Sequence, residues 1–154
     1  MTDEEVQIAE SAGIAKIPVL AALVAIIGII DSLYLTIHHL TAVPVPCSLI
    51  SGCETVLTSQ YAEISGVPLA AFGAVGYFIA FSLAILAAYG NRLMWTIFGI
   101  QAAIMTAITC WLLYLQAFVI GAFCQFCLIS AVTTFTLIIL FVVSKLLRSK
   151  PVPS

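Results

Sequence analysis

Four long apolar stretches constrain the fold of this chain more than any other feature of its sequence. They cover residues 17–40, 68–89, 93–119 and 123–147. Because roughly 20 apolar residues in a helix span the hydrocarbon core of a bilayer, each stretch is long enough to cross once. We therefore predict an all-α membrane protein, a bundle of four transmembrane helices that forms a single membrane domain over residues 1–154.

The composition excludes two other classes of protein. The chain is 63% hydrophobic and 8% charged, whereas a soluble helical bundle would need far more polar surface. It also lacks a basic patch, so we expect no nucleic-acid partner. The first apolar stretch is too long for a cleaved signal peptide, and acidic residues precede it.

The basic residues predict the orientation in the membrane. All five flank helix ends on one side of the bundle: Lys16, Arg92, Lys145, Arg148 and Lys150. Basic residues accumulate on the cytoplasmic side, so both termini are predicted to be cytoplasmic in a multi-pass protein of the cell membrane. The loop 41–67 then faces outward, where disulfides persist.

This outward loop is long for a connection, and loops of such length are usually functional. Ser51 and Glu54 fit a capping box, which predicts a short helix over residues 52–62. We expect this helix to lie over the mouth of the bundle as a lid. Its apolar face would comprise Val56, Leu57 and Tyr61.

Four of the five cysteines lie at the outward edge, in two pairs. Cys47 and Cys53 belong to the loop, and Cys124 and Cys127 begin the last apolar helix. A helix N-terminus favours the thiolate, and the spacing puts both helix sulfurs on one face. Two such pairs suggest a relay that passes electrons by disulfide exchange.

Several alternatives remain for these cysteines. Cys47 and Cys53 could form a static disulfide that staples the loop, and the helix pair could be two small buried residues. Four cysteines could also hold zinc, although one pair lies in a membrane helix and the compartment is oxidising. Cys110, within the third helix, is expected to pack in the core.

Depth along the last helix separates Cys124 from Cys127. We expect Cys124 to lie nearer the surface, where it can meet the loop, and Cys127 to lie deeper among aromatic side chains. Those side chains would be Phe123, Phe126, Trp111 and Phe118.

Three further residues on the first helix can ionise. Asp31 falls just past its middle, and an ionisable group at that depth suggests a functional site. The alternatives are a neutral carboxyl or a hydrogen bond to a Thr or Gln of another helix. His38 and His39, at the outer end, could carry protons or be simply solvated.

The order Cys47, Cys53, Ser59 and then Cys124-Gln125-Phe126-Cys127 resembles the prokaryotic branch of the vitamin K epoxide reductase family over essentially the whole chain. The resemblance implies a quinone (ubiquinone, menaquinone or a related molecule) bound near the outward end. Cys124 and Cys127 would be the active-site pair, with Cys127 next to the quinone. Cys47 and Cys53 would be shuttle cysteines, with Cys47 exchanging with Cys124, and Ser59 would lie beside the quinone.

The function implied is that of a quinone-linked thiol oxidoreductase that supports disulfide formation and needs no metal. Many bacterial members carry a thioredoxin-like domain, whereas this sequence ends at Ser154, so the thioredoxin-like partner is expected to be a separate protein. Animal members have a Thr-Tyr-Ala motif where this chain has Ser130-Ala131-Val132. That departure speaks against coumarin sensitivity and epoxide reduction.

Three rival interpretations remain. The disulfide bond formation protein B family also has four helices, two cysteine pairs and a quinone, but its pairs come in the reverse order. A metal-ion binding or transport protein could use the cysteines as soft ligands. A non-catalytic subunit with a stapled loop would bind no quinone.

Overall fold

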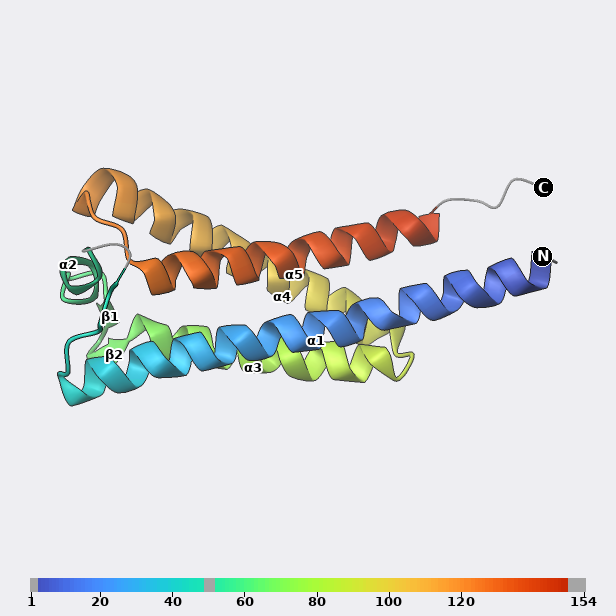
Figure 1. Ribbon diagram of the computed structural model, residues 1–154, viewed down its shortest axis with the longest axis horizontal. Helices are drawn as coiled ribbons and strands as arrows, with labels where there is room; N and C mark the ends of the chain where they lie inside the picture. Colours follow the sequence, from blue (N-terminus) through green and yellow to red (C-terminus); the bar gives the residue numbers. More distant parts are fainter. Residues whose placement is uncertain (1–2, 49–51, 150–154) are drawn as a thin grey trace.

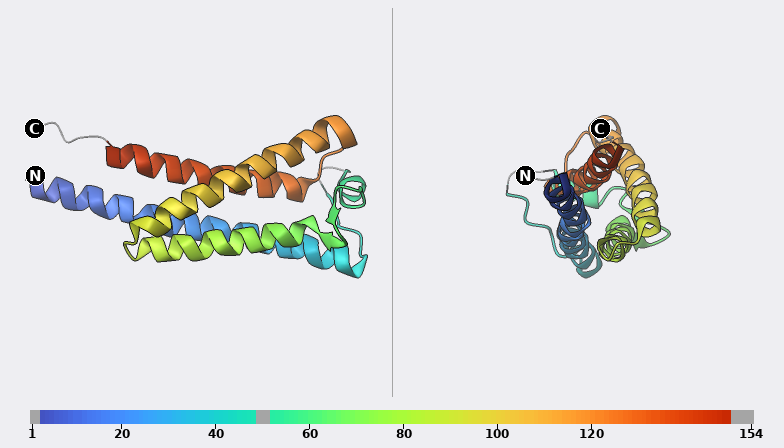
Figure 2. Two further views of the ribbon diagram at one scale, coloured as in Figure 1. Left: turned by 180° about the vertical axis from the view of Figure 1, so that it is seen from behind. Right: turned by 90° about the vertical axis from the view of Figure 1, so that its right-hand side faces the viewer.

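The computed structural model describes residues 3–48 and 52–149, with side chains from residue 16 onward. Its long helices are α1 (Asp3–Thr41), α3 (Leu69–Ala88), α4 (Arg92–Tyr114) and α5 (Gln125–Ser149). They run alternately in opposite directions, so the start of α1 and the end of α5 lie at the same end of the bundle (Figure 1). Seen along its axis, the helices surround a common interior (Figure 2).

The helices confirm the predicted fold class. Four of them are long and apolar enough to cross a membrane: Lys16–Thr41, Leu69–Ala88, Arg92–Ile120 and Gln125–Ser149. The third combines α4 with η1, a π-helical segment over Leu115–Ile120. The chain is a multi-pass membrane protein.

One helix start differs from the prediction. We expected the first helix to begin at residue 17, but α1 begins at Asp3 and continues without interruption into its membrane span. The added segment is rich in Glu and Ala, which have high helix propensity. An apolar run marks where a helix enters the membrane, and a helix can begin well before that point.

The half of the bundle that contains the start of α1 is tightly packed. Small residues of α1 and α3 form much of its core: Ala21, Ala22, Ala25, Ala80, Ala84 and Ala87. Small side chains let membrane helices approach closely. On the other side of this core, the ring of Trp95 stacks on Phe98, and its Nε1 donates a hydrogen bond of 2.7 Å to Ser144 Oγ on α5.

The opposite end of the bundle is closed by α2 (Cys53–Leu57) and by the strands β1 (Glu63–Ile64) and β2 (Val67–Pro68). The strands pair antiparallel, with Glu63 opposite Pro68. Ser65 and Gly66 form the turn between them, and both have a positive φ, as the favoured two-residue hairpin turn requires. Figure 1 shows these elements beside the start of α5.

The short helix is shorter than predicted. We expected it over residues 52–62, but α2 ends at Leu57 because the next two side chains bind backbone carbonyls. Thr58 Oγ1 donates to the carbonyl of Glu54 and Ser59 Oγ to that of Val56, both at 2.7 Å, and such bonds compete with continued helix. The predicted N-cap, Ser51, lies outside the described residues, and Gly52 precedes the helix without a side-chain cap.

Candidate active site

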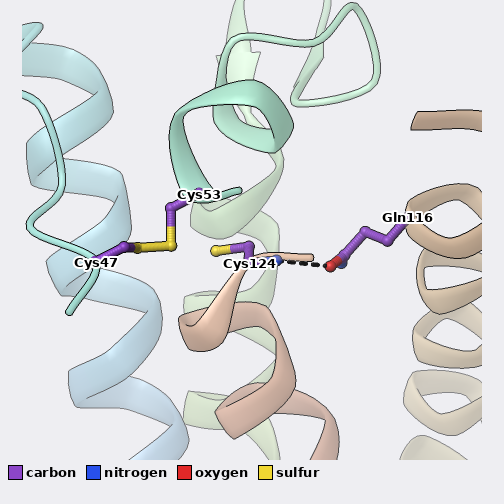
Figure 3. Close-up of a disulfide and its surroundings, with 4 residues drawn as sticks. All are labelled: Cys47, Cys53, Gln116 and Cys124. Atoms are coloured by element: carbon purple, nitrogen blue, oxygen red, sulfur yellow. Dashed lines mark hydrogen bonds between the residues drawn. A yellow bond between two sulfur atoms is a disulfide. The ribbon is translucent and has the colours of Figure 1, made fainter. Parts of the chain in front are cut away.

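Cys47 and Cys53 are joined by a disulfide in the loop that closes the bundle (Figure 3). Their Cα atoms are 6.3 Å apart. Cys53 is the first residue of α2 and is buried, whereas Cys47 is half-buried. Gly52 lets α2 approach the start of α5 closely, because a Cβ at that position would collide with the backbone of Phe123. The two sulfurs of one disulfide therefore differ in access, with Cys47 the more accessible from outside.

Cys124 occupies the N-cap position of α5. Its carbonyl accepts the first helical hydrogen bond, from the backbone N–H of Leu128 at 3.0 Å. Its sulfur accepts hydrogen bonds from the backbone N–H groups of Phe126 and Cys127, the second and third residues of the helix, as an N-cap side chain does. The structure thus uses the start of α5 to hold this sulfur.

These contacts favour the ionised form of Cys124. The hydrogen bond from the Cys127 thiol is the largest cause, and with the backbone N–H groups it outweighs burial and lowers the pKa of Cys124 to about 7. A thiol with such a pKa is substantially thiolate at neutral pH, and the thiolate is the nucleophile in disulfide exchange.

Cys124 meets the loop, as expected, but it is not the more exposed of the two helix cysteines. Cys124 has no exposed surface because α2 covers it, whereas Cys127 is half-buried and lies on the wall of a cavity. Of the aromatic side chains expected around Cys127, Trp111 lines this cavity, but Phe118 is 77% exposed on the outside of the bundle. The covering of Cys124 depends on the fold of the distant loop.

Cys53 is the loop cysteine that packs against Cys124. The two side chains form a buried cluster with Val56, whereas Cys47 packs at the edge of that cluster. Figure 3 shows the sulfur of Cys124 directed toward the disulfide, on the side of Cys53. The exchange of Cys47 with Cys124 stays a prediction, but Cys53 is the better placed loop cysteine in this arrangement because it stands between them.

Gln116 holds both cysteines of the helix pair, and the sequence did not single it out. Its Oε1 accepts a hydrogen bond of 3.1 Å from the backbone N–H of Cys124 (Figure 3), and its side chain also hydrogen-bonds Cys127. Gln116 is buried and lies in the π-helical segment η1, a distortion that is frequent at functional sites. The available signal was a polar amide near the end of an apolar helix.

A cavity of about 700 Å³ lies beneath α2 and the hairpin, between the helices. Its wall is mostly apolar and carries a few polar groups, as in binding sites for small molecules. Those polar groups include Asp31, Ser59, Gln101, Gln116, Cys127 and Ser130. Cys124 is not part of the wall, so Cys127 is the cysteine through which a molecule in the cavity would meet the pair.

Two residues predicted from the sequence, Ser59 and Asp31, lie on this wall and differ in their hydrogen bonding. Ser59 lies beneath the hairpin, but its hydroxyl hydrogen is donated to Val56, which leaves it an acceptor toward the cavity. Asp31 is 8% exposed, and its Oδ2 finds no hydrogen-bond partner among the described residues. The expected hydrogen bond to a Thr or Gln is not made by that oxygen.

The two histidines singled out in the sequence bind groups of the loop, and Cys110 lies away from the site. His39 Nε2 pairs with Glu63 Oε1 at 2.6 Å near the mouth of the cavity, and the ring of His38 hydrogen-bonds the carbonyl of Val43 at 3.1 Å. Both histidines thus hold the loop to the end of α1. Cys110, expected in the core, is exposed on α4, so that prediction is wrong.

Comparison with known proteins places the chain in a family. The model of the vitamin K epoxide reductase family matches residues 19–142, a range that includes both cysteine pairs. The thiol-disulfide oxidoreductase LTO1 of Arabidopsis thaliana is 34% identical over 122 residues, which cover 73% of this chain and 32% of that protein. The chain therefore spans about a third of the length of this relative. On the extent of the family match, the chain belongs to the vitamin K epoxide reductase family.

Proposed function

We propose that this protein is a quinone-linked thiol oxidoreductase that reoxidises a thioredoxin-like partner and so supports disulfide formation. Membership of the family makes the chain an oxidoreductase. One observation carries the finer proposal: the loop disulfide, Cys124 and Cys127 form a continuous path from a half-exposed sulfur to the wall of the cavity.

The relay begins at the loop. A thiolate of the partner attacks the sulfur of Cys47, the more accessible one, and breaks its bond to Cys53. The partner's second thiol then attacks the mixed disulfide and leaves as part of the partner's own disulfide. Two electrons and two protons have now passed to Cys47 and Cys53.

The second exchange moves the electrons inward. The thiolate of Cys53 attacks the sulfur of Cys124 when that sulfur is bonded to Cys127, and the thiolate of Cys127 is released at the cavity wall. Cys47 then attacks Cys53, which restores the loop disulfide and frees Cys124. In the structure the loop pair is oxidised and the helix pair is reduced. This combination is the one expected after the second exchange.

The cavity has the properties that a quinone site needs. It has the volume for a ring, an apolar wall, and a reactive sulfur, that of Cys127, at its surface. A bound quinone would supply an acceptor for two electrons and two protons. Among the residues that would hold it, Ser59 and Tyr61 lie on the loop side and Tyr77 on the helix side. We retain Ser59 as a candidate contact whose hydroxyl accepts rather than donates.

A test of this function uses purified protein in detergent, a reduced thioredoxin-like protein as donor and a short-chain quinone as acceptor. We expect one quinone to be reduced for each disulfide formed, and no reduction by the Cys124→Ser variant. The Cys110→Ser variant removes an exposed thiol outside the site and should keep the wild-type rate. Thiol oxidation that proceeds equally fast without the quinone would contradict the proposal.

We further propose that the cysteine end of the bundle faces outward and that both termini are cytoplasmic, because the basic residues lie at the opposite end. A reporter fused after Ser154 is then expected to be active in the cytoplasm. In the Cys110→Ser background, a membrane-impermeant thiol reagent should label reduced Cys47 in intact cells. Labelling of Cys47 only after the cells are opened would reverse the orientation.

No structural observation favours the metal-binding alternative. Within residues 3–48 and 52–149, no three His, Cys, Asp or Glu side chains are grouped so that they could hold a metal ion. Two of the four outward cysteines are bonded to each other, which removes their thiolates as ligands.

A further inference from the structure

Asp31 is a polar group of the cavity wall to which the relay assigns no role. It lies in the membrane-spanning part of α1, is 8% exposed and contributes to the cavity wall. An ionisable side chain at this depth is costly, and its Oδ2 is buried without a hydrogen-bond partner in the described part of the chain. Buried polar atoms are nearly always paired, so an unpaired one on a cavity wall is available to a molecule bound there.

The position of Asp31 brings it to the level of the reacting pair. On α1, Tyr34 follows it by one turn and packs its ring against Phe126, with 5.1 Å between ring centroids. Because α1 and α5 run in opposite directions (Figure 1), Asp31 lies near the turn of α5 that contains Cys127 and Ser130. Asp31, Cys127 and Ser130 all line the same cavity.

Other proton-bearing groups on the wall already have hydrogen-bond or ion-pair partners. The hydroxyl of Tyr77 on α3 contacts the carbonyl of Ser130 and the hydroxyl of Thr134, each at 2.7 Å, and the hydroxyl of Ser59 is bonded to Val56. At the mouth, Glu63 is paired with His39. Asp31 is thus the carboxyl group of this wall that has an uncommitted buried oxygen.

The proposed reaction needs a group that can hold a proton between the thiol and the acceptor. We propose that Asp31 is a proton-transfer residue of the quinone site, which accepts the proton of the Cys127 thiol and delivers it to an oxygen of the bound quinone. This inference rests on the function proposed above. It gives a role in the reaction to Asp31, whose burial in the membrane would otherwise only destabilise the fold.

The step balances in electrons and protons. Asp31 takes the proton as the sulfur of Cys127 becomes a thiolate, and two electrons leave the cysteine pair as the bond between Cys124 and Cys127 forms. Asp31 then gives its proton to the quinone oxygen and is again a carboxylate. The second proton comes from solvent, because Cys124 reacts as a thiolate. A carboxylate and a thiolate on one cavity wall repel each other, so taking the proton of Cys127 neutralises Asp31 as the Cys127 thiolate forms.

The test is a single turnover of the purified full chain. Protein with a reduced helix pair is mixed with a short-chain quinone, and formation of the Cys124–Cys127 disulfide is followed by thiol counting. General acid–base groups contribute about 10²–10⁴-fold to rate, so we expect Asp31→Asn to slow this step by about 10²-fold or more. Asp31→Glu should recover part of the loss, and Thr36→Val, a polar-to-apolar change on the same helix, should leave the rate unchanged.

Two further measurements separate proton transfer from a structural role. The Asp31→Asn variant should bind the quinone within about threefold of wild type, measured by quenching of tryptophan fluorescence, since Trp111 lines the cavity. It should also gain a solvent deuterium isotope effect because proton transfer becomes limiting. When Cys47→Ala is added, the Asp31→Asn variant should still form the Cys53–Cys124 disulfide. If the Asn variant does not fold, Asp31→Leu removes the buried polar group altogether, and the same slow step is expected.

An Asn or Leu variant that turns over within about threefold of wild type at saturating quinone would overturn the role of Asp31. So would an equal loss of disulfide exchange, quinone binding and turnover, which would indicate a structural defect. A wild-type protein that is not oxidised by the quinone would instead overturn the proposed function, so the two failures are distinguishable.

Discussion

Replacing Cys127 with serine is expected to abolish quinone-dependent turnover and any charge-transfer absorbance between a cysteine thiolate and the quinone ring. Replacing Cys124 is expected to abolish turnover but to strengthen this absorbance. Cys127 lies on the cavity wall and Cys124 does not. Only the sulfur of Cys127 can therefore contact a quinone. In the Cys124→Ser variant, Cys127 has lost its disulfide partner and remains beside the ring.

The expected loss of turnover is large for both variants. Removal of an essential nucleophile typically costs about 10⁴-fold or more in rate, and the two cysteines act as a unit, so the double variant should be no slower than either single one. Absorbance spectra of the purified variants with added quinone, together with turnover rates, make the measurement. Cys110→Ser, exposed on α4, is the control. If the band survived in Cys127→Ser and vanished in Cys124→Ser, the roles of the two sulfurs would be the reverse of those proposed.

Trapping the exchange intermediate should distinguish the two loop cysteines. In the Cys47→Ala variant, Cys53 has lost its own partner while still packed against Cys124. We expect a stable Cys53–Cys124 disulfide to form in most molecules under oxidising conditions. In the matched Cys53→Ala variant, the sulfur of Cys47 lies at the edge of the cluster, so little Cys47–Cys124 disulfide is expected.

Both variants can be assayed on non-reducing gels after proteolysis between residues 53 and 124, or by mass spectrometry of the linked peptides. The Thr55→Val variant in the Cys47→Ala background is a matched control, because it changes an exposed residue of the same loop and keeps both sulfurs. If Cys53→Ala traps and Cys47→Ala does not, then the exchange runs through Cys47, and the loop must rearrange before it reacts.

The sequence was sufficient for features that depend on local properties. Hydropathy and length predicted four membrane-spanning helices, and the structure has them within a few residues of the predicted bounds. The turn between α3 and α4 is local too: Gly90 has a positive φ, and Asn91 caps α4 by accepting from the N–H groups of Leu93 and Met94. The order and spacing of the cysteines, with Ser59, predicted the family to which the chain belongs.

Tertiary structure decided which groups meet. The sequence does not show which of Cys47 and Cys53 is more exposed. It also gives no reason to expect that Gln116 binds both Cys124 and Cys127. Spacing within a segment fixes only which side chains share a face. Contacts between a loop and a helix start more than 60 residues away depend on how α2 packs over α5.

The same distinction explains the predictions that the structure overturned. The five-residue length of α2 depends on side chains that compete for its carbonyls, and the complete burial of Cys124 depends on the loop that covers it. Hydropathy could mark Asp31 as costly, but only the packed bundle brings its free oxygen to the wall that also holds Cys127. The membrane fold and the chemistry available to the chain can be predicted from the amino-acid sequence, because hydropathy and residue type are local. The proposed route of electrons and protons depends on the tertiary structure, because each transfer needs contact between groups far apart in the chain.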